Sequence, residues 1–466
     1  MTSGALRWAM AALAFALLAA LVILPADLLP PARAALAVFG TAVILWTTTR
    51  LDAAWIAFAA AVALVPLQAA DQAELMAMLG HNIIWLMAGA FVIGAAIQSS
   101  GLAARITGGI AARARTTAQL FWLTTLALIP LTFLIPSTSG RAAAALPALN
   151  LLPADAADTR RRAFALLIPV VILVATSAAL TGAGSHLLAQ DLLDQRLGER
   201  FGFANWALWG LPFAAVSSAI ACGVILRLFL TPAQRGAAIE AGATTDRAAL
   251  SGTEWRVIVV AATTFGLWFT TDWHGLEIAT VAILAMIALT APRVGVMSFK
   301  AGMKAVNWSL ILFVGGAMLL GQALINTQAA GWLIDRLFAL AGLEGSRAGT
   351  LPEIAVVGAV ALISTASHLF LTSHVARTAA LGPPFILMAQ SAGIEPIAVL
   401  FIATVGMNYC LTLPACSKAL LLFQDVDGGG FRPADLLRLS AVLAPINVAL
   451  MIAAYFAWWK WTGLAL

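Results

Sequence analysis

The chain is poor in charged residues. Only 10% of its 466 residues are Asp, Glu, Lys or Arg, while 62% are hydrophobic, and the mean hydropathy is +0.96. This composition excludes an ordinary soluble domain and predicts an all-α, polytopic membrane protein whose main partner is the lipid bilayer. The net charge of +5 comes from Lys and Arg scattered through short loops, with no basic tail, so we expect no nucleic-acid partner.

Motifs of enzymes and metal sites are also missing. The three cysteines, Cys222, Cys410 and Cys416, lie in apolar runs without metal-ligand spacing, and there is no HExxH or GxSxG sequence. Every Asp and Glu falls in a loop or at the end of an apolar run. We therefore expect no enzyme, no cofactor and no metal ion held by these residues.

The long apolar runs are what the chain has instead. About 17 to 25 apolar residues cross a bilayer, which predicts eleven spans near 8–24, 34–48, 52–68, 83–99, 163–190, 206–231, 255–271, 275–291, 306–326, 395–424 and 435–462. The first run lacks a cleavage site and is expected to be retained. Most Lys and Arg lie in the loops that are cytoplasmic if the amino terminus is cytoplasmic, so we expect that orientation in the cell membrane, a bacterial inner membrane.

Two further apolar regions, 119–152 and 350–392, are each interrupted by a similar polar phrase. The first reads Ser137-Thr138-Ser139-Gly140-Arg141 and the second Ser373-His374-Val375-Ala376-Arg377, which begins 236 residues later. A proline, Pro147 or Pro383, follows each serine after ten residues. Polar residues at membrane depth usually mark a substrate or ion pathway, so we predict two re-entrant hairpins with these phrases at their tips.

Other landmarks recur in the same order. Gly89 and Gly94 match Gly316 and Gly321 at an offset of 227 residues, and Ser185-His186 matches Ser417-Lys418 at an offset of 232. An odd number of spans per repeat turns the second half upside down in the membrane, so the pattern predicts two inverted repeats.

Three cations, Arg141, Arg377 and Lys418, fall inside these apolar regions with no acidic residue at their depth. An anion is the expected partner, because helix amino termini at the breaks add positive charge and the guanidinium fork fits carboxylate or sulfate. The alternatives are that Ser and Gly only allow close helix packing and that the long basic side chains, Lys418 above all, reach water at an interface.

With these motifs the chain resembles the divalent anion/sodium symporters, which carry di- and tricarboxylates or sulfate. That family has eleven spans, two re-entrant hairpins, two inverted repeats and a Ser-Asn-Thr motif at each hairpin tip, with a proline ten residues after the serine. The resemblance implies an elevator-type carrier of a small divalent anion, built as a homodimer. The resemblance implies that Ser137, Thr138, Ser139, Ser185, Ser373, His374 and Ser417 bind the substrate, and the cost of cations at membrane depth adds Arg141, Arg377 and Lys418 to this set.

The chain departs from the family at the tips. Thr138 and His374 replace the two asparagines, and Arg141 and Arg377 stand where the family has a small or hydroxyl residue. Sodium beside a fixed cation would be repelled by several kcal/mol at an effective dielectric constant near 20, so the family's sodium coupling is not carried over to this chain, and sodium binding stays one of the alternatives. We expect the basic side chains to supply the charge that sodium supplies elsewhere, which favours exchange of one anion for another.

Several functions stay open at this point. Proton coupling through His374 or His186 is one, because histidine titrates near neutral pH. Sodium- or proton-coupled symport of sulfate or a sulfonate is another, and an anion channel is a third. The anion could be a dicarboxylate, citrate, tartrate, sulfate or a sulfonate.

The resemblance also divides the chain. Residues 1–118 are expected to form the first scaffold part, with spans one to four and an interfacial arm, and 255–349 the second, with spans seven to nine and its arm. Residues 119–231 and 350–466 are expected to form the moving transport parts, each with one hairpin. The segment 232–254 is expected to be a cytoplasmic loop.

Overall fold

The computed structural model describes residues 3–49, 51–111, 113–153, 155, 158–239, 249–340, 352–424, 426 and 429–466. Residues 240–248 of the expected loop 232–254, and 350–351 of the expected second hairpin region, lie outside this set. The described chain is helical throughout, apart from one isolated bridge between Thr116 and Ala238. This confirms the prediction of an all-α protein.

The first half contains the helices α1 Ser3–Ile23, α2 Pro30–Thr48, α3 Ala53–Leu64, α4 Gln72–Ala77, α5 Asn82–Ser99, α6 Leu102–Ala111, α7 Thr117–Leu134, α8 Thr138–Ala145, α9 Thr159–Val174, α10 Gly184–Leu197, α11 Phe203–Phe229 and α12 Pro232–Gly236. The second half contains α13 Gly252–Phe269, α14 Thr271–His274, α15 Ile278–Thr290, α16 Phe299–Ala305, α17 Trp308–Asn326, α18 Ala329–Leu340, α19 Glu353–Ala366, α20 His374–Ala392, α21 Pro396–Met407, α22 Lys418–Gln424 and α23 Pro433–Ala457.

Several of these helices are long and apolar enough to cross a membrane. Among the described residues seven segments meet that criterion: Pro30–Thr48, Gln72–Ser99, Thr117–Leu134, Thr159–Ala178, Phe203–Phe229, Trp308–Asn326 and Pro433–Ala457. Shorter apolar helices include Ala53–Leu64, Ile278–Thr290 and Pro396–Met407. The structure is thus that of a multi-pass membrane protein, while the number of eleven spans stays a prediction.

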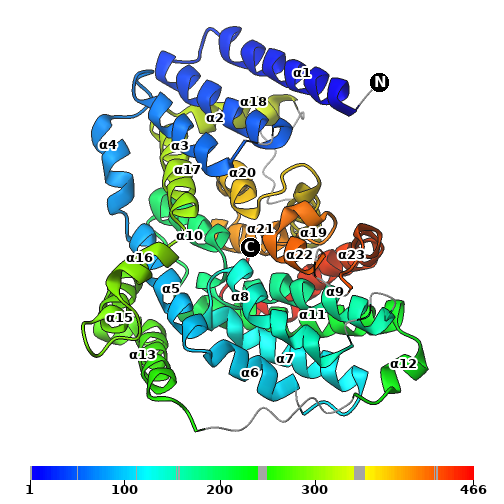
Figure 1. The fold of residues 1–466 in the computed structure, drawn as a ribbon. Helices are drawn as coiled ribbons and strands as arrows, with labels where there is room; N and C mark the ends of the chain where they lie inside the picture. The colour runs from blue at the N-terminus through cyan, green and yellow to red at the C-terminus, as the bar shows by residue number, and fades with distance from the viewer. Residues whose placement is uncertain are drawn as a thin grey trace.

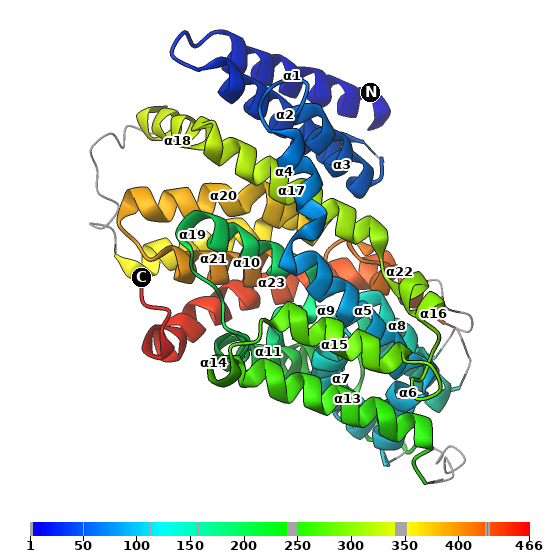
Figure 2. The same cartoon turned by 90° about the vertical axis from the view of Figure 1, so that its left-hand side faces the viewer.

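Two helix pairs bring together segments that are far apart in the sequence. In Figures 1 and 2 the blue helices α3 and α5 lie beside α17 and α15, respectively, and both pairs are in contact. The contacts are close because each contains a glycine: a Cβ on Gly89 would lie 2.6 Å from the carbonyl oxygen of Ala282, and a Cβ on Gly316 would lie 2.6 Å from that of Ala57. The recurrent glycines of the two halves therefore make the same backbone approach.

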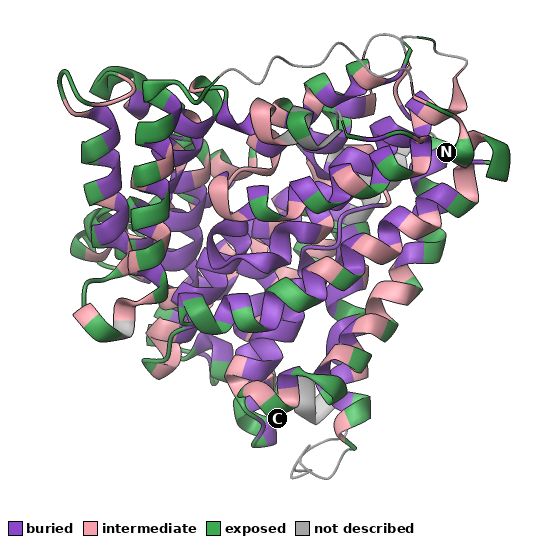
Figure 3. Ribbon diagram, turned by 90° about the horizontal axis from the view of Figure 1, so that it is seen from below, coloured by how far each residue is buried: buried purple, intermediate pink, exposed green. Residues whose placement is uncertain are grey.

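The helices around the two polar phrases pack on one another in a second group. Here α20 contacts α10 and α21, α19 contacts α21 and α23, and α9 contacts α7, α11 and α22. Figure 3 shows that buried residues are concentrated in the middle of the molecule. Helices α9 and α21 are buried along nearly all of their length, so the residues that follow them lie deep in the protein.

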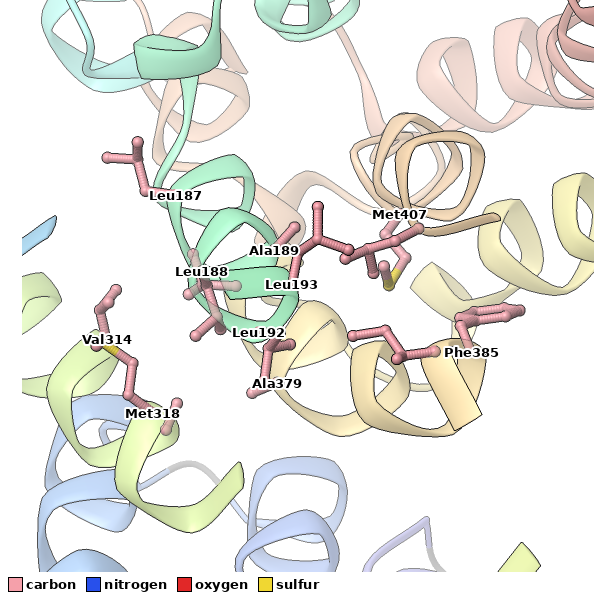
Figure 4. Packing of buried hydrophobic residues seen from close by; sticks show 14 of the residues in the cluster. Leu187, Leu188, Ala189, Leu192, Leu193, Val314, Met318, Ala379, Phe385 and Met407 are labelled. Carbon is pink, nitrogen blue, oxygen red and sulfur yellow. The ribbon is translucent and has the colours of Figure 1, made fainter. Parts of the chain in front are cut away.

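Helix α10 joins the two groups by an apolar seam. Its leucines, among them Leu188 and Leu192, face Val314 and Met318 of α17 and also pack toward α20 and α21 (Figure 4). A Cβ on Gly321 of α17 would lie 3.1 Å from a methyl group of Leu192. The glycine therefore leaves the space that the leucine fills.

We predict that Gly89→Ala and Gly316→Ala each lower the free energy of unfolding. The added methyl group would press on a neighbouring backbone, and overpacking of this kind costs about 1–3 kcal/mol. Gly223→Ala in α11 is the matched control, because a Cβ there meets nothing within 4 Å. The midpoint of thermal unfolding in detergent would measure the difference. Equal midpoints for all three variants would contradict the packing described here.

Candidate functional site

The two polar phrases begin helices in the same way. Ser137 is the N-cap of α8 and accepts a hydrogen bond from the backbone N–H of Gly140 at 3.2 Å; Ser373 is the N-cap of α20 and accepts one from Ala376 at 3.3 Å. Capping leaves each serine bound to its own helix, as is common for N-cap serines. The helix amino termini, with their free N–H groups, lie at the two turns.

Two of the expected spans, 163–190 and 395–424, are interrupted by non-helical segments. After α9 the chain forms two short 3₁₀ turns, Ala175–Ala178 and Leu180–Gly182, before α10 begins at Gly184. After α21 residues 408–417 are irregular apart from a 3₁₀ turn at Pro414–Cys416. The first break is buried, and the second is buried at 408–411 and again at Cys416 and Ser417, so backbone carbonyl groups of both are available to polar side chains inside the protein.

Arg141, near the start of α8, forms hydrogen bonds to the first break, residues 175–183. Its side chain is fully buried and donates to the hydroxyl groups of Thr132 and Thr176, the latter at 3.2 Å, and to the carbonyl oxygen of Gly182 at 3.1 Å. Both terminal nitrogens of the guanidinium are used, and only Nε has no partner in the described chain.

Arg377 occupies the matching place in the second half but is bonded less completely. It is also fully buried, and its Nη1 donates to the carbonyl oxygen of Tyr409 in the second break at 2.7 Å. Its Nε and Nη2 have no hydrogen-bond partner in the part of the chain that the structure describes. The thiols of Cys410 and Cys416 interact electrostatically with it, and that of Cys410 is also a polar neighbour of its guanidinium group.

These cations gather without an acidic partner. His374 interacts electrostatically with Arg377, His186 and Arg141, so the structure brings the four basic residues together. No ion pair among the described residues involves either arginine. An unpaired buried charge costs several kcal/mol, so a site with two such cations favours an anion.

A polar residue that the sequence did not single out links the two breaks. Asn408, at the end of α21, accepts a hydrogen bond from Ser185 Oγ at 2.8 Å through Oδ1, and its amide nitrogen contacts His186 Nε2. The other ring nitrogen of His186 lies 2.9 Å from the carbonyl oxygen of Ala179, and the ring packs against Trp206 at a tilt of 33°. Asn408 could have been suspected, since it is an amide inside the apolar run 395–424, but its partner 223 residues away could not.

The remaining predicted site residues differ in exposure. Thr138, Ser139 and His374 are half-buried at the turns, and their side chains make no hydrogen bond to a described residue. Ser417 is buried and caps the start of α22 through Ala419 N–H at 3.2 Å. Lys418 is exposed, so its side chain is not one of the buried cations.

The expectation that every acidic residue lies in a loop or at the end of an apolar run is wrong for Asp191. Because α10 begins only at Gly184, this residue falls in the middle of the helix, where it is fully buried. Its carboxylate faces His81 at 3.2 Å and accepts from Gln195 at 2.6 Å. It therefore pairs with the start of α5 and not with the arginines.

A cavity of about 330 Å³ reaches the first turn. It is lined by Gly94 and Gln98 of α5, by Ser137 and Gly140 at the turn and by Asn307 before α17, together with Phe91, Ala95, Ile135, Pro136 and Ala305. Gly94, which faces this cavity, corresponds to Gly321, whose space is filled by Leu192. The first turn is thus open on one side.

Comparison with known proteins agrees with this architecture. Residues 5–465 match the family described as the sodium:sulfate symporter transmembrane region. A membrane protein of Cupriavidus necator is 27% identical over 98% of this chain and 93% of its own length. The L-tartrate/succinate antiporter of Shigella dysenteriae (24% identical) and the citrate/succinate antiporter of Escherichia coli (22%) each align with 81% of this chain over 78% of their own length.

The fold also has a solved counterpart. The YdaH transporter of Alcanivorax borkumensis superposes with a TM-score of 0.58 at 14% identity, over 94% of this chain and 100% of that one. Because the family match covers nearly all of the chain, the protein belongs to the sodium:sulfate symporter family, as a divergent, multi-pass membrane transporter and not an enzyme.

Proposed function

We propose that the protein exchanges small divalent organic anions, di- or tricarboxylates, across the cell membrane without sodium. The observation that carries the proposal is the pair of fully buried arginines with no acidic partner among the described residues. Two guanidinium groups match the charge of a dianion, and a guanidinium can bind a carboxylate through paired N–H groups. The named antiporters among the relatives carry succinate with tartrate or citrate, which supports a carboxylate substrate.

The same charges favour exchange over one-way transport. Without an anion the moving part would have to cross the membrane with two uncompensated cations, and intramembrane charges are costly. A bound anion on the outward and on the return journey avoids that cost. Sodium is not needed in this scheme because the guanidinium groups are permanent cations.

The proposed mechanism is an elevator. Residues 1–118 and 255–349 would form the fixed scaffold and the dimer contact, and 119–231 with 350–466 would carry the anion at the two hairpin tips. The full set of eleven spans, with two inverted repeats and a cytoplasmic amino terminus, belongs to this proposal. The cavity at Ser137 and the leucine seam of α10 fit a state that is open to one side, which would be the cytoplasm in this orientation.

Proton coupling would have to use His374 and not His186. Asn408 is oriented by Ser185, so its amide nitrogen donates to His186 Nε2, and the Nδ1 proton then faces the carbonyl oxygen of Ala179. Both ring nitrogens are satisfied in the neutral form, and another proton would displace Asn408. His374 has no such partners in the described chain and is free to bind the anion.

Transport assays in proteoliposomes test the proposed function. We expect external radiolabelled succinate to accumulate when unlabelled succinate, citrate or tartrate is inside, with equal rates in sodium and in potassium buffers. Sulfate and a sulfonate complete the panel, and a proton gradient is applied in a parallel set. A channel cannot accumulate label by counterflow. An absolute requirement for sodium, or uptake of sulfate alone, would refute the proposal and favour symport.

A cross-link between the two parts tests the elevator. Gly321→Cys with Leu192→Cys joins α17 to α10, two helices that must slide past one another, so oxidation should abolish most counterflow and reduction should restore it. The control pair, Gly302→Cys with Thr290→Cys, lies wholly inside the proposed scaffold, where a Cβ on Gly302 would be 3.0 Å from Thr290. Its cross-link should leave transport unchanged. Equal rates for both oxidised pairs would exclude relative movement of α10 and α17.

A further inference from the structure

Arg141 and Arg377 have different sets of hydrogen-bond partners, although the sequence around them repeats. The offset of 236 residues that relates Arg141 to Arg377 also relates Thr132 to His368. The offset of 232 that relates Ser185 to Ser417 relates Thr176 to Asn408 and Gly182 to Pro414. If the second half matched the first, Arg377 would therefore form its hydrogen bonds with His368, Asn408 and Pro414.

All three first-half positions bind Arg141. Thr132 and Thr176 offer hydroxyl oxygens and Gly182 offers its carbonyl oxygen, and together they occupy both terminal nitrogens. The three oxygens come from α7 and from the two turns of the first break, so they surround the guanidinium from different elements. Two N–H groups are left, that of Nε and the second one of Nη1, and both N–H groups of Nη2 are used.

None of the second-half positions binds Arg377. His368 contacts the carbonyl oxygen of Thr365 and, at 2.6 Å, the hydroxyl of Thr412. Asn408 is engaged by Ser185 and His186 from the other half. The carbonyl oxygen of Pro414 accepts from the backbone N–H of Ser417 at 3.3 Å. Each counterpart has acquired a different partner.

The donors left free on Arg377 form one edge of the guanidinium. Nε and Nη2 point the same way and are spaced to hold the two oxygens of a carboxylate. The side chain is fully buried, so leaving both donors unsatisfied is costly unless a ligand takes them. Arg141 lacks such an edge, because its Nη2 is already bonded to Thr176 and Gly182.

We propose that the two arginines have separate roles: Arg377 binds a carboxylate of the substrate through Nε and Nη2, whereas Arg141 is a positioning residue that supplies fixed positive charge without touching the anion. This assignment rests on the proposed function, anion exchange, and names the ligand within it. The site is then asymmetric, with one carboxylate held rigidly at the second tip. The rest of the anion faces the first tip, where Ser137 and the cavity lie.

The test compares two variants that keep the charge and remove only the planar fork. Arg377→Lys should raise the KM for succinate counterflow about 10- to 100-fold, since a point charge replaces two paired hydrogen bonds to a carboxylate. Arg141→Lys should keep the KM within about threefold and lower the maximal rate. It changes the hydrogen bonds that Arg141 makes to the three oxygens around it and removes no contact with the anion. Binding of unlabelled succinate, followed as the shift of the unfolding midpoint, should show the same division.

The outcomes separate this assignment from the proposed function. An equal rise of the KM in both variants, or a larger rise in Arg141→Lys, would overturn the division of roles while leaving anion exchange intact. Absence of counterflow in the unmodified protein would instead refute anion exchange itself. If Arg141→Lys does not fold, Thr176→Val replaces it: this variant removes one bond from Arg141 without changing charge, and a KM raised as much as in Arg377→Lys would be equally damaging.

Discussion

A guanidinium group in an apolar interior, without an acidic partner, is the constraint on which the rest of this structure depends. Arg141 and Arg377 are both fully buried. Burying each cation is tolerable only because a helix is broken nearby and turns its carbonyl groups, those of Gly182 and Tyr409, inward. The breaks in α9–α10 and α21–α22 therefore have an electrostatic reason as well as a topological one.

The two halves share a frame and differ at the site. Gly89 and Gly316 make the same close backbone contact, so the packing of α5 on α15 repeats in that of α17 on α3. Around the arginines the correspondence ends, since Thr176 bonds its own half's arginine and Asn408 bonds the opposite half. Packing between helix backbones leaves little freedom to change, whereas side chains around a ligand can diverge position by position.

The sequence was sufficient for the fold class and for the position of the two polar turns, but not for the helix breaks after α9 and α21. The fold class and the turns follow from apolar run length and from the cost of polar groups in lipid, which are local properties of the chain. It could not reveal the Ser185–Asn408–His186 network, because a hydrogen bond between residues more than 220 positions apart depends on how the halves are packed. Asp191 was misjudged for a related reason: its burial is set by where α10 starts and by His81 of another helix.

The two buried cations also have an electrical consequence under the proposed mechanism. Both lie in the parts that would move, so their charge would cross the membrane field at every step. A bound dianion cancels them, and its exchange for another dianion would then be insensitive to the membrane potential. A trianion leaves one surplus negative charge, and each 100 mV would bias its movement by about 2.3 kcal/mol. With Arg141 and Arg377 both moving, the membrane potential would thus affect the exchange of trianions and leave that of dianions unchanged.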